Sequence, residues 1–349
     1  MFNESEAVTP RPVRRALVLE GGGARGAFEA GALLYLHDHP EVFAPEIVTG
    51  TSVGGLNAAG FAFGLTPELA AAWSRITSWE VYRRRSLLHH AFTLLVEKRF
   101  THLYDTTPLQ RLLESFFGSR GLMDCPLRLK VTAFNLQTGA SEVFDNESPV
   151  RLVDALMASS ALQALFPPHT INGFQYIDGG NGANLPLRPA LQEGATDLVI
   201  VRSAAGSALN PWLYRDMVTI QKRAHLSLMS YVTSSDLARA QELTELLRRH
   251  RRQRLELRSA IEELVEDEGP RARLLGLFDA QPPLSRDKLP VRMRVITPPP
   301  GARMPAVLDF DPEVSLGLMR LGYLEARRVL ERPAPGHRRR SFGRRHVRA

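Results

Sequence analysis

The sequence has little of what builds disulfide-rich or membrane-spanning proteins. Among its 349 residues is a single cysteine, Cys125, so no disulfide can form within the chain. No run of about 18 uninterrupted apolar residues is present, and the first residues, MFNESEAVTPRPVRR, lack the apolar core of a signal peptide. We therefore expect a cytoplasmic protein in which Cys125 is a buried spectator thiol. Peripheral contact with a membrane stays open.

Acidic residues are missing from the C-terminal end. Residues 333–349 contain six arginines and no acid, so they carry most of the net charge of +7. We expect residues 332–349 to be a basic disordered tail, with contact to anionic lipid or nucleic acid as the alternative. Residues 1–13 are expected to be a disordered N-terminal arm. Aromatic residues make up only 7% of the chain and do not interleave with the basic ones, so no specific nucleic-acid partner is predicted.

Between these ends the composition is that of an ordinary globular protein, with 44% hydrophobic residues. Strand and helix patterns alternate, which predicts an α/β fold with a mainly parallel sheet covered on both faces. The predicted strands are 14–20, 46–50, 128–134, 141–145, 174–178, 196–202 and 291–296. The predicted helices are 25–38, 53–64, 67–79, 107–118, 150–161, 187–193 and 311–331, with a long helical region over 212–268.

The segment GTSVG presents Ser52 between Gly50 and Gly54. An apolar strand precedes it and a helix of small residues follows, so Ser52 is predicted to sit on a tight strand-to-helix elbow. Glycines on both sides remove side chains that would crowd a nucleophile there. The N-terminal N–H groups of the following helix also point toward an anion formed at the serine.

The segment EGGGARG forms a second glycine turn after a strand. Gly21, Gly23 and Gly26 also satisfy the dinucleotide pattern, but the acidic residue expected about 20 positions later is absent, because Gly50, Thr51 and Ser52 stand there. We favour an oxyanion hole built from the backbone N–H groups of Gly21, Gly22, Gly23, Ala24, Arg25 and Gly26. The side chain of Arg25 either locks this loop or engages a substrate phosphate, and we favour the lock.

The run YIDGGNGANLP places Asp178 at the end of a predicted strand, before a glycine turn over residues 179–184 that includes Gly179 and Gly180. Asp178 is either a base for Ser52 or a turn residue that bonds its own backbone. A histidine triad is the other alternative. Its downstream candidates are His225, His250, His337 and His346. None of these lies on a strand-end loop, which favours a direct Ser52–Asp178 dyad.

Together, in this order, the three segments resemble the patatin-like phospholipases. The resemblance covers most of residues 14–205, including LYDTTPLQRLLESFF (103–117) and ASSALQALFPPHTINGFQYIDGGNGANLPLRPA (158–190). It implies a three-layer α/β/α sandwich and lipid acyl hydrolysis by a Ser–Asp dyad without metal or cofactor. Carried over by motif, Ser52 is the nucleophile, Asp178 the proton acceptor, and Gly21–Gly26 the oxyanion loop.

We therefore predict one catalytic domain over residues 14–331 that acts on a lipid or phospholipid ester. An acyltransferase with the same dyad and a catalytically silent lipid-binding module are the alternatives. Residues 206–290 have no clear counterpart in the family, and the charge run RRHRRQR (248–254) is expected to be a solvated helix face. Residues 81–100 mix leucines with arginines, typical of an interfacial membrane helix or lid, or of an ordinary amphipathic helix.

Overall fold

The computed structural model describes residues 13–86, 102–203, 213–281, 284–285 and 289–331. The predicted disordered segments, 1–13 and 332–349, lie outside this range except for Val13. The strands are β1 (Arg15–Leu19), β2 (Ile47–Thr51), β3 (Arg83–Arg84), β4 (Tyr104–Asp105), β5 (Arg128–Asn135), β6 (Ala140–Asp145), β7 (His169–Ile171), β8 (Phe174–Asp178), β9 (Asp197–Val201) and β10 (Arg292–Ile296).

The helices follow the predicted alternation. They are α1 (Gly26–Asp38), α2 (Val53–Ala62), α3 (Thr66–Trp73), α4 (Ser78–Val81), α6 (Thr107–Phe117), α7 (Leu152–Ser159), α8 (Gly180–Ala183), α9 (Leu187–Gln192), α10 (Met217–Leu264), α11 (Glu268–Ala280) and α12 (Pro312–Leu330), with short 3₁₀ turns at Gly23–Arg25 and Leu122–Asp124.

The central sheet has the strand order β10-β9-β1-β2-β5-β8-β7, and β6 also pairs with β5. The strands from β10 to β5 are parallel, whereas β6, β8 and β7 pair antiparallel to their neighbours. Strand β1 sends Leu17 and Leu19 into one core cluster and Ala16 and Val18 into the other. Both faces of the sheet are thus covered, and the predicted three-layer α/β/α fold is confirmed.

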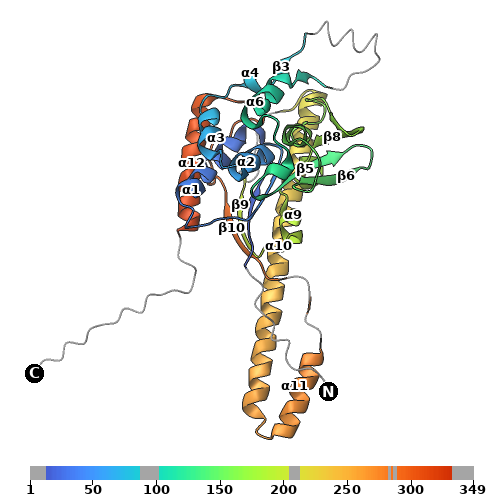
Figure 1. Ribbon diagram of the computed structural model, residues 1–349, viewed down its shortest axis with the longest axis vertical. Coiled ribbons are helices and arrows are strands. Elements are labelled where there is room, and N and C mark those ends of the chain that lie inside the picture. Colours follow the sequence, from blue (N-terminus) through green and yellow to red (C-terminus); the bar gives the residue numbers. More distant parts are fainter. Residues whose placement is uncertain (1–12, 87–101, 204–212, 282–283, 286–288, 332–349) are drawn as a thin grey trace, which may run out of the picture.

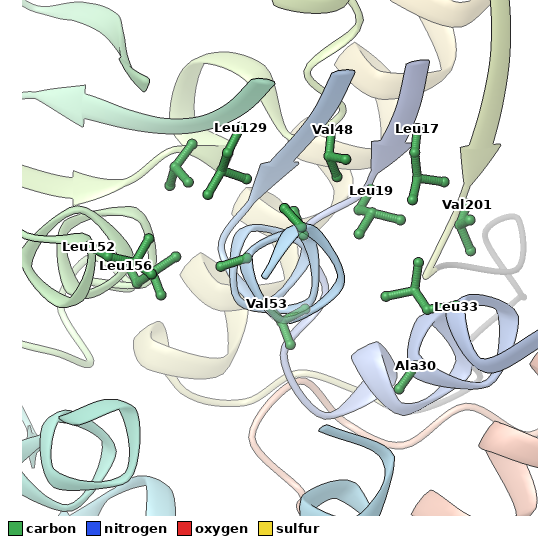
Figure 2. Close-up of a cluster of buried hydrophobic side chains, with 14 of the residues drawn as sticks. Leu17, Leu19, Ala30, Leu33, Val48, Val53, Leu129, Leu152, Leu156 and Val201 are labelled. Carbon is green, nitrogen blue, oxygen red and sulfur yellow. The ribbon is translucent and has the colours of Figure 1, made fainter. Parts of the chain in front are cut away.

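Figure 2 shows the larger core, where α7, α2 and α1 lie side by side under one face of the sheet. The opposite face packs against α9 and the first half of α10, through Leu187 and Leu237. The second half of α10 leaves the body and turns back through α11, so that the two helices form an antiparallel hairpin beside the α/β core (Figure 1).

Three local predictions were wrong. The helix expected over 67–79 is two helices, because Glu80 accepts hydrogen bonds from the N–H and the hydroxyl of Thr77 and thereby starts α4. The turn expected after Asp178 is the one-turn helix α8. The segment 81–100 is not one helix, because α4 ends at Val81 and residues 83–84 form β3, which pairs with β4; residues 87–101 lie outside the described residues.

Candidate active site

Ser52 lies at the junction of β2 and α2 in a strained conformation. Its backbone has φ 55° and ψ −129°, a region that costs a non-glycine residue about 1–3 kcal/mol. A side chain at Gly50 would collide with the carbonyl oxygen of Gly54, so the elbow is closed too tightly for any residue but glycine. The predicted elbow is therefore present, with Ser52 only 7% exposed.

Ser159, the last residue of α7, stabilises this conformation of Ser52. Its hydroxyl accepts the backbone N–H of Ser52 at 2.8 Å and donates to the carbonyl of Thr132 at 2.6 Å. Both groups are buried, so each would be costly to leave unpaired. Ser159 was not among the site residues predicted from the sequence, although it lies in the stretch 158–190 that resembles the family.

Strand β5 brings Asp178 to the same place. Thr51, the last residue of β2, pairs with Thr132 of β5, and Asp178, the last residue of β8, pairs with Ala133. Strand β6 pairs with β5 throughout this region, so β2 and β8 share its other edge. The carboxyl ends of β2 and β8 therefore meet along one edge of β5, which makes Ser52 and Asp178 neighbours.

The Asp178 carboxylate is almost fully buried. Burial raises its pKa to about 6, while the nearby Ser52 hydroxyl and the Gly180 N–H act in the opposite direction. Its Oδ1 accepts the Gly180 N–H at 2.8 Å, as an Asp-Gly turn residue would do. Its Oδ2 has no hydrogen-bond partner of good geometry among the described residues. The Ser52 hydroxyl therefore lies near the Asp178 carboxylate, but the two groups do not form a hydrogen bond of good geometry.

Most backbone N–H groups of the first glycine loop are already occupied. Gly21 donates to the Asn184 carbonyl at 2.9 Å and Ala24 to the Val307 carbonyl at 2.8 Å, while Arg25 and Gly26 bond within the loop. Within the described part of the chain, the N–H groups of Gly22 and Gly23 have no such acceptor. The geometry narrows the oxyanion donors predicted over Gly21–Gly26 to these two. Gly23 has φ +57°, and a side chain there would meet Val307.

Hydrogen bonds to three distant segments hold the loop in place. The Ser203 hydroxyl donates to the Gly21 carbonyl at 3.0 Å, and the Asn184 amide donates to the same oxygen at 3.3 Å. The Nε of Arg25 donates to the Pro305 carbonyl at 3.0 Å, which supports the locking role for this side chain. Ser203 and Pro305 carry no motif that could have identified them in the sequence.

An apolar cavity of about 90 Å³ reaches Ser52. Helices α2, α3 and α6 supply most of its wall, through leucines and aromatic rings such as Leu56, Leu113 and Phe117. Gly23 and Ser160 also line it. Ser52 and Gly23 thus line the same apolar cavity.

The histidines of the alternative triad are placed elsewhere or outside the described residues. His225 and His250 lie on α10, with His250 on the part that leaves the body, and His337 and His346 fall in the undescribed C-terminal segment. None of the interactions recorded for Ser52 or Asp178 in the described part of the chain involves a histidine. Cys125 is buried, as predicted, and its burial raises the pKa of the thiol to about 11.

The family model of the patatin-like phospholipases matches residues 17–191, half of the chain and all three motifs. The chain belongs to the patatin-like phospholipase family. This result confirms the predicted family, and every element of the candidate site except Ser203 and the segment around Val307 lies inside the matched range.

Curated relatives match a little more than half of the chain. A cGAMP-activated phospholipase of Escherichia coli (strain TW11681) is 30% identical over 210 residues, covering 54% of this chain and 58% of the relative. A lysophospholipase NTE1 of Meyerozyma guilliermondii is 26% identical over 203 residues, 58% of this chain and 13% of the relative. The match thus spans little more than half of the first relative's length.

Among solved structures, VipD from Legionella pneumophila aligns over 91% of this chain and 67% of its own, with a TM-score of 0.43 and 14% identity. No helix in the described part of this patatin-like chain is both long and apolar enough to span a membrane.

Proposed function

We propose that this chain is a lipid acyl hydrolase in which Ser52 is the nucleophile and Asp178 the base. The observation that carries the proposal is the strained backbone of Ser52 beside a buried carboxylate whose pKa lies near 6. A base with a pKa near the working pH transfers protons more effectively than an ordinary aspartate. Structural carboxylates are usually hydrogen-bonded on both oxygens, whereas Asp178 Oδ2 is buried and has no such partner among the described residues.

The proposed first half-reaction moves one proton and exchanges one bond. Asp178 takes the hydroxyl proton as Ser52 Oγ bonds to the ester carbonyl carbon, and the carbonyl oxygen becomes an oxyanion. The N–H groups of Gly22 and Gly23, with that of Val53 at the start of α2, would stabilise this charge. The tetrahedral intermediate then expels the alcohol or lysolipid, which leaves with the proton from Asp178.

The second half-reaction regenerates the serine. Water gives a proton to Asp178 as its oxygen attacks the acyl-enzyme, and the fatty acid leaves as Ser52 recovers its proton. The apolar cavity would hold the acyl chain, which selects lipid esters over polar ones. An alcohol or lysolipid in place of water would make the same site an acyltransferase.

The proposal treats residues 14–331 as one catalytic domain in which the α10–α11 hairpin is an addition to the patatin-like core. It also includes peripheral contact with anionic membranes, where the substrate is found. The segments that the sequence assigns to that contact, residues 81–100 and the basic tail, lie mostly outside the described residues.

Covalent labelling tests the proposal directly. A fluorophosphonate should add to the protein once, and peptide mass spectrometry should place the adduct on Ser52. Ser160→Ala is a matched control, because the hydroxyl of Ser160 is buried in the same cavity and has no hydrogen-bond partner among the described residues. Labelling should survive Ser160→Ala and disappear in Ser52→Ala. An adduct on Ser160 would overturn the assignment of Ser52 as the nucleophile. No adduct on folded wild-type protein would favour a catalytically silent lipid-binding module.

A further inference from the structure

The projecting part of the α10–α11 hairpin, residues 248–280, has no buried residue. Helix α10 packs on the body as far as Leu247, which is buried, and from residue 248 to its end each residue is exposed or half-buried. No residue of α11 is buried. Figure 1 shows α11 and the second half of α10 projecting away from the α/β body. Since helical stability in water comes mostly from burying an apolar face, this hairpin needs a further surface to pack against.

Two arginines of α10 contact α11. The Arg254 guanidinium lies 4.3 Å from the centre of the Phe278 ring and donates to backbone carbonyls of α11 and the following residue. Arg258 pairs with Asp279 at 3.1 Å. These contacts show which side of each helix faces the other. Several exposed leucines of the hairpin lie away from that side.

The unused leucines gather on one side of the hairpin. Each lies one residue before a residue that is half-buried or contacts the other helix: Leu257 before Arg258, Leu264 before Val265, Leu274 before Leu275 and Leu277 before Phe278. Consecutive residues of an α-helix are rotated by about 100° around the helix axis. In two antiparallel helices that face each other, the residue before each contact residue therefore lies on the same side of the pair. We call these four residues the leucine face. Leu257 is 57% exposed, Leu264 79% and Leu277 68%.

Charge along α10 indicates what covers this face. Residues 248–254 contain five arginines and no acid, whereas residues 262–268 contain five acids and no base. The two blocks are equally far from Arg258. A second α10 running antiparallel, with the two-fold axis near Leu257, places each basic block against the partner's acidic block. Such a surface complements itself, as a two-fold interface requires.

We propose that a second copy of this chain covers the leucine face, giving an antiparallel dimer whose two hairpins form a four-helix bundle. The overlap of about 18 residues spans about 27 Å. The tip of each hairpin then lies beside residue 248 of the partner, where the partner's α10 begins to project from its α/β body. The four-helix bundle is therefore as long as the projecting part of α10. Leu257 and Leu277 lie near the axis, because Arg254 and Arg258 place Phe278 and Asp279 at the same level.

The first test is sedimentation equilibrium of the full chain over a range of concentrations. The wild type should form a dimer. The double variant Leu257→Asp/Leu277→Asp should raise the dissociation constant of that dimer at least tenfold. Leu255→Asp is the matched control, since Leu255 is 61% exposed on the same hairpin but lies one residue after Arg254, on the opposite face. Unchanged turnover of a soluble ester checks the fold. A monomeric wild type, or equal effects of both changes, would overturn the proposal.

A charge swap tests the antiparallel register. Arg249 and Glu263 are exposed, and neither has an ion pair among the described residues. Arg249→Glu and Glu263→Arg should each weaken the homodimer, whereas an equal mixture of the two variants should dimerise nearly as well as the wild type. In the mixed dimer, opposite charges face each other at both contacts between positions 249 and 263. If the mixture dimerises no better than either variant alone, the proposed interface is wrong. It is also wrong if the two changes leave dimerisation unaffected and instead weaken the binding of monomers to anionic vesicles through residues 248–254.

Discussion

The hydroxyl of Ser159 accepts the backbone N–H of Ser52 at 2.8 Å and donates its own hydrogen bond to the Thr132 carbonyl at 2.6 Å. One side chain thus ties the strained elbow to the strand that also positions Asp178. Ser159 therefore supports the backbone of Ser52, the proposed nucleophile.

Ser159→Ala should therefore lower kcat on a soluble ester by about 10- to 100-fold while KM changes little, because the nucleophile shifts while the cavity stays intact. The buried Ser52 N–H also loses its acceptor, which should reduce the free energy of unfolding by about 1–3 kcal/mol. Ser74→Ala is the control, because the exposed Ser74 hydroxyl donates to the carbonyl of Ala71 in its own helix and has no other hydrogen bond among the described residues. Equal kinetics for the two variants would remove Ser159 from the support of the site.

The pH dependence of kcat/KM should follow Asp178. The ionised carboxylate is the active form, so kcat/KM on a soluble ester should be constant above its pKa of about 6 and fall tenfold per pH unit below it. The measurement is a pH profile from about 4 to about 8, with the protein checked for folding at each pH. A constant rate down to about pH 4.5 would contradict the raised pKa or the role of Asp178.

Asp178→Asn should abolish activity and yet stabilise the fold at neutral pH. Folding raises the pKa of Asp178 from 3.8 to about 6, so its contribution to stability is present below pH 3.8 and is lost as the pH rises through 6. Asparagine has no charge to bury. The variant should gain roughly 2–3 kcal/mol over the wild type at about pH 8, and this difference should vanish near pH 4.

Asp145→Asn is the contrasting control for that measurement. Asp145 forms an ion pair with Lys130, and although burial acts in the opposite direction, its partners lower its pKa. Its loss should destabilise the protein at about pH 8. Thermal unfolding of both variants at about pH 4 and about pH 8 tests the two signs together, and a lower Tm for Asp178→Asn at the higher pH would contradict the buried-charge argument.

Replacing any one downstream histidine should be mild. His225→Gln, His250→Gln, His337→Gln and His346→Gln should each keep kcat/KM within about tenfold, since the proposed base is Asp178. A general base typically contributes about 10²–10⁴-fold. A thousandfold loss in one folded variant, with circular dichroism unchanged, would favour a triad instead.

Filling the apolar cavity should separate long from short substrates. Ala72 lines the cavity and its neighbour Ala71 is exposed outside the lining, so Ala72→Phe and Ala71→Phe form a matched pair. Ala72→Phe should lower kcat/KM for a long-chain ester at least tenfold and leave an acetate ester nearly unchanged, whereas Ala71→Phe should affect neither. Equal losses on both esters would show that the cavity does not hold the acyl chain.

The sequence predicted the parts of this protein that local patterns determine. The elbow at Ser52, the strand end at Asp178 and the glycine loop each combine a strand pattern with glycines, and all three are present as elements. The split between α3 and α4 depends on one capping interaction, that of Thr77 with Glu80, which competes with an otherwise continuous helical pattern.

Other features could not be predicted because they arise from contacts between distant segments. Ser203 and Val307 reach the glycine loop from beyond residue 200, and no local pattern marks them. Contacts between distant segments also occupy the N–H groups of Gly21 and Ala24, through the carbonyls of Asn184 and Val307, whereas those of Gly22 and Gly23 have no such acceptor among the described residues. The helical stretch after residue 206 was recognised, but its turn at residues 265–267 and the return helix α11 were not.

The meeting of β2 and β8 along one edge of β5 makes the proposed chemistry a property of the whole sheet. Ser52 and Asp178 are separated by more than a hundred residues, and they become neighbours only when both strands pair with Thr132 and Ala133. No local segment could keep the two groups together if those pairings were lost. Ester turnover should therefore disappear along the same denaturant curve as the secondary structure of the sheet, so a simple rate measurement would serve as a probe of global folding.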